Sequence, residues 1–195
     1  MISGYQLLIK RLFDIVLSLL LLPFLIPPII IFFIIATIDT KEFGLFSQYR
    51  VGQEGRLFKI LKIRTLRKET HRLGELHLSA TKFGNWLRGS KLDELPQLFN
   101  VLTGQMSFVG PRPDVVGFAD LLEGDDRIIL MVKPGITGPA TIKYKDEDNL
   151  LALQNNPEVY NRTIIWPDKV KINKNYVQNW SFYLDLKYIF QSIGN

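Results

Sequence analysis

Two adjacent carboxylates, Asp93 and Glu94, are the side chains whose types and spacing point most directly to chemistry. They precede residues 95–102, where apolar side chains recur at close to helical spacing. A carboxylate can attack phosphorus to form an acyl phosphate, and neighbouring carboxylates can hold Mg²⁺. The structural alternative is that acids are common at helix starts, where the helix dipole stabilises them. In that case Ser90 could cap the helix, with Asp93 as its capping-box partner.

Arginines lie on both sides of this carboxylate pair. Arg88 is just upstream, and Arg112 stands between Pro111 and Pro113, which restrict the backbone and so present the guanidinium with little entropy to lose. Because a guanidinium binds phosphate through paired hydrogen bonds, both arginines are candidate phosphate ligands. Further cationic candidates in the preceding segment are Lys59, Lys62 and Arg64. Carboxylates among several cations indicate phosphoryl transfer assisted by Mg²⁺.

The composition narrows the chemistry further. The chain has 195 residues, no cysteine and two histidines, which excludes disulfides, cysteine-based zinc or iron–sulfur sites and cysteine nucleophiles, and argues against a Ser-His-Asp triad. Any metal would be a hard cation held by oxygen. Residues 41–91 contain twelve Lys or Arg and four acids, so this segment carries more positive charge than the net +5 of the whole chain. Such a segment favours an anionic partner, and the alternative is an ordinary solvated face.

An uncharged run, Ile15–Ile38, precedes the basic segment. As a straight helix it would be about 36 Å long, enough to cross a bilayer core. Pro23, Pro27 and Pro28 lie in its middle, and each removes a backbone donor and crowds the preceding turn. We therefore expect a sharp break near residues 26–28, which would leave two arms that are each too short to span the membrane.

Positive charge lies on both sides of this run and so gives no orientation to a spanning helix. It suits a re-entrant helix within residues 1–40 whose two ends return to the same face, and a spanning helix is the alternative. Lys10 and Arg11 precede the run, and Asp14 is expected to pair with one of them at the membrane surface. Residues 41–195 would then form a membrane-associated domain on the cytoplasmic side.

The pattern after residue 40 predicts a mostly helical α+β fold with a small β-hairpin. Glycines and a short apolar and basic strand indicate the hairpin. The last predicted helix is amphipathic and rich in aromatic residues, which suits a membrane interface, and the alternative is a helix packed on the protein's own core. The expected elements are a hairpin within 41–64, helices at 95–102, 114–122 and 176–193, rigid loops at 104–113 and 133–139, and an irregular stretch at 155–175.

Several of these segments together resemble the small monotopic phosphoglycosyl transferases, the bacterial sugar transferase family. A single such motif would be a weak signal, but these occur in order over most of the chain. They are Lys10-Arg11-x-x-Asp14, Gln48-x-Arg50-x-Gly52, Phe58-Lys59-Ile60-x-Lys62-x-Arg64-Thr65, Leu92-Asp93-Glu94-Leu95-Pro96-Gln97, Asn100-Val101, Met106-Ser107, Val109-Gly110-Pro111-Arg112-Pro113 and Lys133-Pro134-Gly135-Ile136-Thr137-Gly138.

The resemblance implies a Mg²⁺-dependent, ping-pong transfer of a sugar phosphate from a nucleoside diphosphate sugar, usually a UDP-sugar, to polyprenyl (undecaprenyl) phosphate, with release of UMP. It makes Asp93 the nucleophile and gives Glu94 a part in metal binding or in handling the acceptor proton. Arg88 and Arg112 would hold phosphate, with Pro111 and Pro113 near the nucleotide. Lys59, Lys62, Arg64 and Gln97 would complete the substrate site, and Lys10, Arg11, Asp14 and Pro27 would belong to the anchor.

The family context places such an enzyme at the cytoplasmic face of the bacterial inner membrane, at the first membrane step of exopolysaccharide, capsule, O-antigen or glycoprotein glycan assembly. It implies membrane lipids as partners and no nucleic acid, and it leaves a homodimer open. Ile26 stands where the family often has Ser, and the sequence after Gly138 departs from the family pattern, so sugar specificity does not carry over. The alternative function is a membrane-tethered basic module that binds anionic lipid or nucleic acid without catalysis, which would leave the Asp93-Glu94 pair unexplained.

Overall fold

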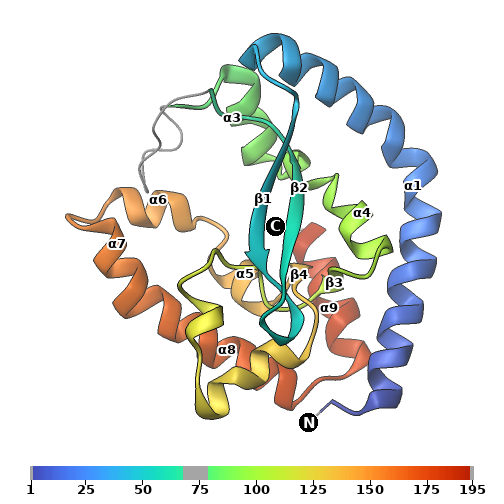
Figure 1. Ribbon diagram of the computed structural model, residues 1–195, viewed down its shortest axis with the longest axis vertical. Helices are drawn as coiled ribbons and strands as arrows, with labels where there is room; N and C mark the ends of the chain where they lie inside the picture. Colours follow the sequence, from blue (N-terminus) through green and yellow to red (C-terminus); the bar gives the residue numbers. More distant parts are fainter. Residues whose placement is uncertain (1, 68–78, 194–195) are drawn as a thin grey trace.

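A single long helix, α1, runs along one side of the molecule, and a mixed α+β domain packs against it (Figure 1). The computed structural model describes residues 2–67 and 79–193. Most of the described residues are helical, as predicted. The helices are α1 (Gly4–Thr40), α3 (Lys82–Gly89), α4 (Gln97–Leu102), α5 (Pro139–Lys143), α6 (Glu147–Ala152), α7 (Pro157–Tyr160), α8 (Trp166–Gln178) and α9 (Phe182–Ile193), and the strands are β1 (Leu45–Val51), β2 (Leu57–Ile63), β3 (Ser107–Val109) and β4 (Gly135–Thr137).

Helix α1 begins at a capping box and continues through all three of its prolines. The Ser3 hydroxyl accepts from the Gln6 amide, and the Gln6 side chain accepts from the Ser3 amide. Pro23, Pro27 and Pro28 lie inside the helix, so the predicted interruption near residues 26–28 is wrong. Figure 1 shows the helix bending over the top of the domain instead. Prolines that remove hydrogen bonds and crowd the preceding turn can bend a helix without ending it.

The two faces of α1 reverse the usual pattern of a soluble amphipathic helix. Toward its N-terminus, the face against the domain carries Lys10, Asp14 and Ser18, all buried. The opposite face exposes large apolar side chains along the whole helix. The helix is long and apolar enough to cross a membrane by length and composition, with a mean hydropathy of 2.9 in its most apolar window. The large apolar side chains exposed on the outer face of α1 are Leu8, Leu12, Val16, Leu19, Leu20, Phe24, Ile26, Ile30, Ile31, Ile34, Ile35 and Ile38.

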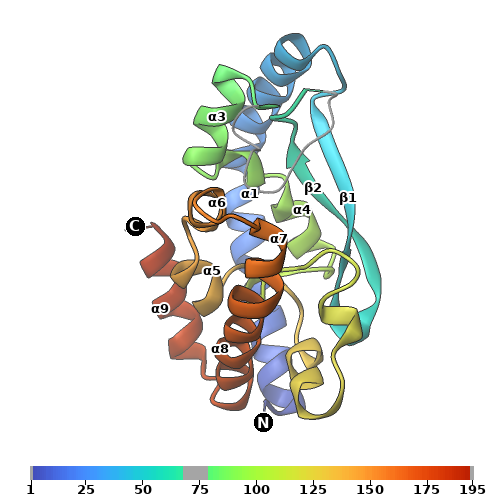
Figure 2. The same ribbon diagram turned by 90° about the vertical axis from the view of Figure 1, so that its left-hand side faces the viewer.

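Both ends of α1 are fastened to the same domain. Near the N-terminus, Lys10 forms a buried ion pair with Asp185 of α9. Near the C-terminus, Phe32 makes an edge-on contact with Phe83 of α3, with ring centroids 6.1 Å apart, and the hairpin lies alongside (Figure 2). The folded domain therefore covers one side of both halves of the helix.

The predicted hairpin is confirmed. Strand β1 pairs antiparallel with β2, with Leu45 opposite Ile63 and Val51 opposite Leu57. A second, smaller sheet pairs β3 parallel with β4 in the two segments that the sequence predicted to be rigid loops. The predicted helix at 95–102 is present as α4.

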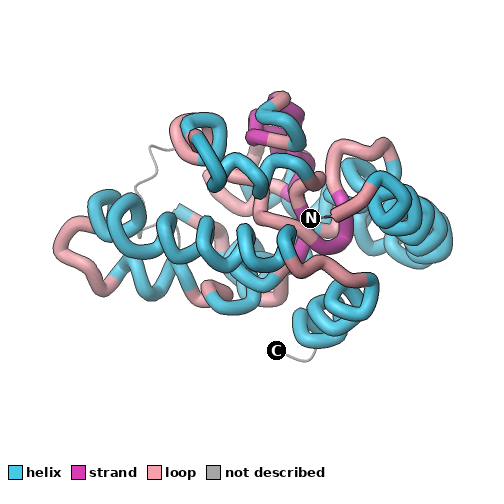
Figure 3. The backbone as a smooth tube through the Cα atoms, turned by 90° about the horizontal axis from the view of Figure 1, so that it is seen from below, coloured by secondary structure: helices cyan, strands magenta, loops and turns pink. Residues whose placement is uncertain are grey.

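The predictions for the C-terminal half are less accurate. Only a short 3₁₀ turn, Ala119–Leu121, forms where a helix was predicted at 114–122, because Asp120 accepts hydrogen bonds from the Gly117 and Phe118 amides and stabilises a turn there. The stretch expected to be irregular contains α7, a π-helical turn and α8. The helix predicted at 176–193 is divided between α8 and α9, which lie on the side of the molecule away from the hairpin (Figures 2 and 3).

Candidate active site

The carboxylate pair lies on a tight turn that is packed against the apolar helix. Lys91 adopts a left-handed conformation with a φ of 58°, and the 3₁₀ turn Leu92–Glu94 follows it directly. Leu92 and Leu95 on either side pack into the cluster formed by Ile29, Ala36, Ile63 and Leu87. This packing turns Asp93 and Glu94 inward, where 4% and 7% of their surfaces are exposed. Ser90 ends α3 and donates to the Trp86 carbonyl, so the capping-box alternative is wrong.

Glu94 is held between two cations from different parts of the chain. Its carboxylate lies 2.6 Å from Arg112 Nη2 and 2.8 Å from Lys62 Nζ. Burial opposes ionisation, but the charges of Arg112 and Lys62 together hold the pKa of Glu94 well below its usual range. Glu94 is therefore a fixed anion that joins β2, the 3₁₀ turn Leu92–Glu94 and the Pro111–Pro113 loop.

Asp93 is much less constrained than its neighbour. Among the described residues, Lys62 is the cation that pairs with it, with Nζ 3.9 Å from Oδ2, and no hydrogen bond reaches its carboxylate. Burial raises the pKa of Asp93, and the charge of Lys62 partly offsets that rise. Of the two carboxylates, Asp93 is the one whose oxygens are available to react.

Close packing of glycines fixes the loop that presents Arg112. A Cβ on Gly135 would lie 2.1 Å from the Gly110 nitrogen, so the two backbones can approach only because neither residue has a side chain. The Gly135 amide donates to the Pro111 carbonyl at 2.8 Å, and the Gly110 amide donates to the Thr137 carbonyl at 2.9 Å. The Lys133–Gly138 motif therefore acts on the site by positioning the Arg112 loop.

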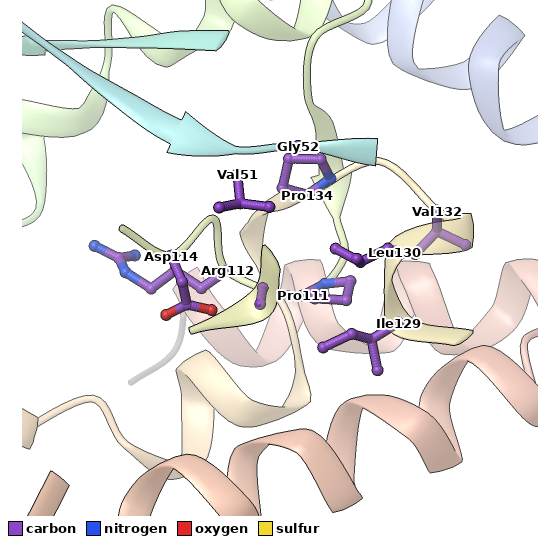
Figure 4. Close-up of a pocket in the computed structure, with 10 residues that line it drawn as sticks. Val51, Gly52, Pro111, Arg112, Asp114, Ile129, Leu130, Val132 and Pro134 are labelled. Carbon is purple, nitrogen blue, oxygen red and sulfur yellow. The ribbon is translucent and has the colours of Figure 1, made fainter. Parts of the chain in front are cut away.

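Behind this loop lies a small apolar cavity, with Arg112 and Asp114 at its edge (Figure 4). Its volume of about 10 Å³ leaves room for about one water molecule and not for a nucleotide. Burial raises the pKa of Asp114 to about 6, although Lys169 and Arg50 oppose that rise. The apolar side chains of the cavity hold the loop from behind, and they are Val51, Pro111, Ala119, Ile129, Leu130, Val132 and Pro134.

Arg50 belongs to the site but was not among the predicted site residues. Its guanidinium donates to the Pro113 carbonyl at 3.5 Å. Its positive charge opposes the rise in the pKa of Asp114, and Arg112 is near enough to repel it. The Gln48-x-Arg50-x-Gly52 motif was the signal that could have identified it.

Helix α6 brings further acids to the site from the segment that departs from the family pattern. Asp148 lies 2.6 Å from Arg88, and Glu147 pairs with Lys169 of α8, also at 2.6 Å. Arg88 is close enough to Asp93 for its charge to lower the pKa of that carboxyl. Arg88, one of the predicted phosphate ligands, is thus already paired with a carboxylate of the same chain, Asp148.

Three of the predicted substrate-binding residues form no ion pair or hydrogen bond with the described carboxylates of Asp93 and Glu94. Lys59 points to the opposite face of β2 from Lys62 and lies over the Tyr49 ring at 5.3 Å. Arg64 donates to the Phe43 carbonyl at 2.8 Å. Gln97 is buried at the start of α4, and its Nε2 has no hydrogen-bond partner in the part of the chain that the structure describes.

Three of the predicted anchor residues, Lys10, Arg11 and Asp14, turn toward the domain. Asp14 pairs with neither Lys10 nor Arg11 but accepts from the Ser107 hydroxyl and the Phe108 amide. Arg11 donates to the carbonyls of Val101 and Leu102 at the end of α4, at 2.6 and 2.7 Å. Pro27 lies within α1.

The model of one protein family, described as bacterial sugar transferase, matches residues 5–195. The chain belongs to the bacterial sugar transferase family.

Relatives of this bacterial sugar transferase agree with that assignment. The "Uncharacterized sugar transferase EpsL" of Bacillus subtilis is 37% identical over 184 residues, which cover 92% of this chain and 82% of the relative. The UDP-glucose:undecaprenyl-phosphate glucose-1-phosphate transferases of Klebsiella pneumoniae and Escherichia coli are 36% and 33% identical over 98% of this chain. This chain spans 41% of the length of each of those two enzymes. The predicted membership of a family of phosphoglycosyl transferase enzymes is confirmed.

The carboxylates of this transferase fit a Mg²⁺ that arrives with a substrate. The described residues contain no group of three or more Asp, Glu, His or Cys side chains that could hold a metal ion. Mg²⁺ is commonly bound by one or two carboxylates together with substrate phosphates, and Asp93 and Glu94 are the carboxylates that would hold it here. Because Glu94 is already shared by two cations, Asp93 is the carboxylate whose oxygens are free of hydrogen bonds to the described residues.

We expect Lys62→Met to move the acidic limb of the pH profile of kcat/KM to higher pH. Lys62 lowers the pKa of Asp93, so removing its charge raises that pKa further and keeps the carboxyl protonated over a wider range. Activity should therefore fall more at about pH 6 than at about pH 8. Lys59→Met, on the other face of the same strand, is the matched control, and an equal shift in both variants would contradict the assignment.

We expect Asp148→Asn to lower the KM for the sugar donor by about two- to fivefold, because Arg88 no longer has to leave an internal anion before binding phosphate. The melting temperature should hardly change, since the Asp148 side chain is 57% exposed. Asp126→Asn breaks a comparable exposed pair with Lys174, 2.8 Å apart, and should leave the KM unchanged. Steady-state kinetics of both variants test this, and an unchanged or raised KM in Asp148→Asn would refute it.

Proposed function

We propose that this chain transfers a sugar 1-phosphate from a UDP-sugar to undecaprenyl phosphate and releases UMP. The observation that carries the proposal is the buried carboxylate pair, in which Glu94 is fixed by Arg112 and Lys62 while Asp93 beside it makes no hydrogen bond to the described residues. Relatives that match nearly the whole chain are named undecaprenyl-phosphate glucose-1-phosphate transferases, which supports this substrate class.

Asp93 is the proposed nucleophile. A carboxylate oxygen of Asp93 attacks the β-phosphorus of the donor, and the bond from that phosphorus to the bridging oxygen breaks, so UMP leaves with that oxygen. The sugar phosphate remains on Asp93 as an acyl phosphate. An oxygen of undecaprenyl phosphate then attacks the same phosphorus, the Asp93 carboxylate leaves, and the product is undecaprenyl diphosphate sugar.

The surrounding groups are suited to hold the charge of this reaction. Arg112 and Lys62 supply positive charge beside the reacting carboxylate, and Arg88 can bind phosphate when it leaves Asp148. A pKa well below its usual range favours Glu94 as a permanent anion that positions these cations rather than as a proton carrier. Asp93 and Glu94 would hold Mg²⁺, which when bound neutralises the diphosphate.

We further propose that α1 enters one leaflet and returns to the cytoplasmic face of the bacterial inner membrane. The support is that one domain covers the same side of both halves of the helix, while the opposite side exposes apolar residues along its whole length. A spanning helix would draw part of that domain into the lipid. The catalytic turn packs on the second half of α1, so a re-entrant helix brings Asp93 to the membrane surface, where a lipid phosphate can reach it.

The reaction is tested with the full chain in detergent, Mg²⁺, undecaprenyl phosphate and a panel of UDP-sugars. We expect UMP release with at least one sugar, its loss on addition of EDTA, and a decrease of more than about a thousandfold in Asp93→Asn, because the nucleophile is removed. Asp126→Asn, an exposed acid away from the site, is the control and should keep full activity. Turnover by Asp93→Asn equal to that of the control would remove Asp93 as the nucleophile.

The anchor is tested by labelling single cysteines, since the chain has none of its own. Gly4→Cys and Lys41→Cys report the two ends of α1, and Lys171→Cys reports the domain; each of these positions is exposed. In spheroplasts all three should resist an impermeant maleimide, and in inverted vesicles all three should react. Reaction of one helix end in spheroplasts and of the other in inverted vesicles would establish a spanning helix instead.

A further inference from the structure

A second cavity, of about 290 Å³, lies at the N-terminal end of α1 and apart from the carboxylate pair. Arg11 on its wall donates to the carbonyls at the end of α4, whereas Asp93 and Glu94 precede the start of that helix. None of the residues assigned to the catalytic centre lines it. Its lining residues are Gly4, Leu7, Leu8, Lys10, Arg11, Asp14, Gln53, Ser107 and Lys133.

Two cations, Arg11 and Lys133, converge on this cavity. Arg11 Nη2 and Lys133 Nζ each lie 3.2 Å from the position that a Cβ on Gly104 would take. Within the described parts of the chain, neither forms an ion pair with a carboxylate. Their positive charges repel each other, and an anion bound between them would remove that repulsion.

The other charged groups of the cavity are already engaged. Lys10 is paired with Asp185. One oxygen of Asp14 accepts from the Ser107 hydroxyl at 3.1 Å and from the Phe108 amide at 3.0 Å. The donors to Asp14 are neutral, so Asp14 keeps one negative charge against the two positive charges of Arg11 and Lys133, and the three together leave a net positive charge. That charge is suited to a phosphate-type anion because a guanidinium and an ammonium can both donate to phosphate oxygens.

One wall of the cavity continues into the apolar outer face of α1. Leu7 and Leu8 line it, and the exposed side chains of Leu8 and Leu12 lead on along the helix. A ligand with a phosphate at one end and a hydrocarbon chain at the other would place each part against matching groups. A free phosphate would leave the apolar wall uncovered.

We propose that this cavity binds the headgroup of an anionic phospholipid. Arg11 and Lys133 contact the phosphate oxygens, and Leu7, Leu8 and Leu12 contact the first carbons of an acyl chain. The inference rests on the proposed membrane placement of α1. It gives the N-terminal end of the helix a specific lipid contact, separate from the site that receives the acceptor.

The test measures binding of dihexanoyl phosphatidylglycerol to the purified full chain in detergent by isothermal titration calorimetry. We expect Lys133→Gln to weaken binding at least about fivefold through loss of one charge-assisted hydrogen bond, and Lys133→Arg to restore it. Lys171→Gln, an exposed cation on α8, makes the same charge change elsewhere and should have no effect. Equal weakening in the two glutamine variants, or none in Lys133→Gln, would overturn the inference.

Two further ligands separate the sources of the anion. Dihexanoyl phosphatidylcholine has the same tails and no net charge, and we expect it to bind more weakly; equal affinity would overturn the inference. Inorganic phosphate should compete poorly, and competition as strong as that of the lipid would make this a free-anion site and overturn the lipid assignment. Binding is measured without turnover, so lack of lipid binding by a chain that releases UMP overturns this inference alone. A chain that binds the lipid but releases no UMP would contradict the proposed function alone.

Discussion

The site depends on one buried carboxylate, Glu94, that is shared by Arg112 and Lys62. These three side chains come from the turn Leu92–Glu94, the Pro111–Pro113 loop and strand β2, which are distant in sequence. A buried charge without a partner is unfavourable by about 3–5 kcal/mol, so each segment is held in place by the need to compensate the others. Asp93 inherits its position from Glu94 and remains free of hydrogen bonds to the described residues. A reactive carboxylate next to a fixed one is the arrangement that the proposed reaction requires.

Buried polar contacts also determine how helix α1 is oriented on the domain. Its polar side chains, Lys10, Arg11 and Asp14, bind the domain, and large apolar side chains are exposed along its outer face. In water such an apolar face would favour aggregation, whereas in a membrane it is the stable orientation. Leu92 and Leu95 beside the catalytic turn pack on the second half of this helix, so the position of the helix in the lipid would also set the depth of Asp93.

Local patterns predicted the parts of the fold that local interactions determine. The hairpin followed from glycines and a short strand, and α4 followed from apolar spacing. The carboxylate pair and the proline-flanked Arg112 could be identified because their chemistry is visible in adjacent residues. Lys59 and Lys62 looked equivalent in the sequence, but they are three residues apart on a strand and so point to opposite faces.

Long-range contacts determine what the sequence did not reveal. Asp14 lies one helical turn from Lys10, yet the two do not pair. Lys10 pairs with Asp185 of α9, and Asp14 accepts from Ser107 and Phe108 of β3, and these partners come within reach only when α9 and β3 dock on α1. The polar stretch before residue 176 folds as helix because pairs such as Lys169–Glu147 and Lys143–Asp168 and the burial of Val170 stabilise α8. The role of α6 at Arg88 depends on the same docking, and the divergence of its sequence concealed it.

The most direct test of this account is the mass of the intact protein after incubation with UDP-sugar and Mg²⁺ and without the lipid acceptor. The account predicts a species heavier by one sugar phosphate, with peptide mapping that places the added group on Asp93. A protein that turns over donor and acceptor but never acquires this mass, or that carries it on Glu94, would contradict the central claim.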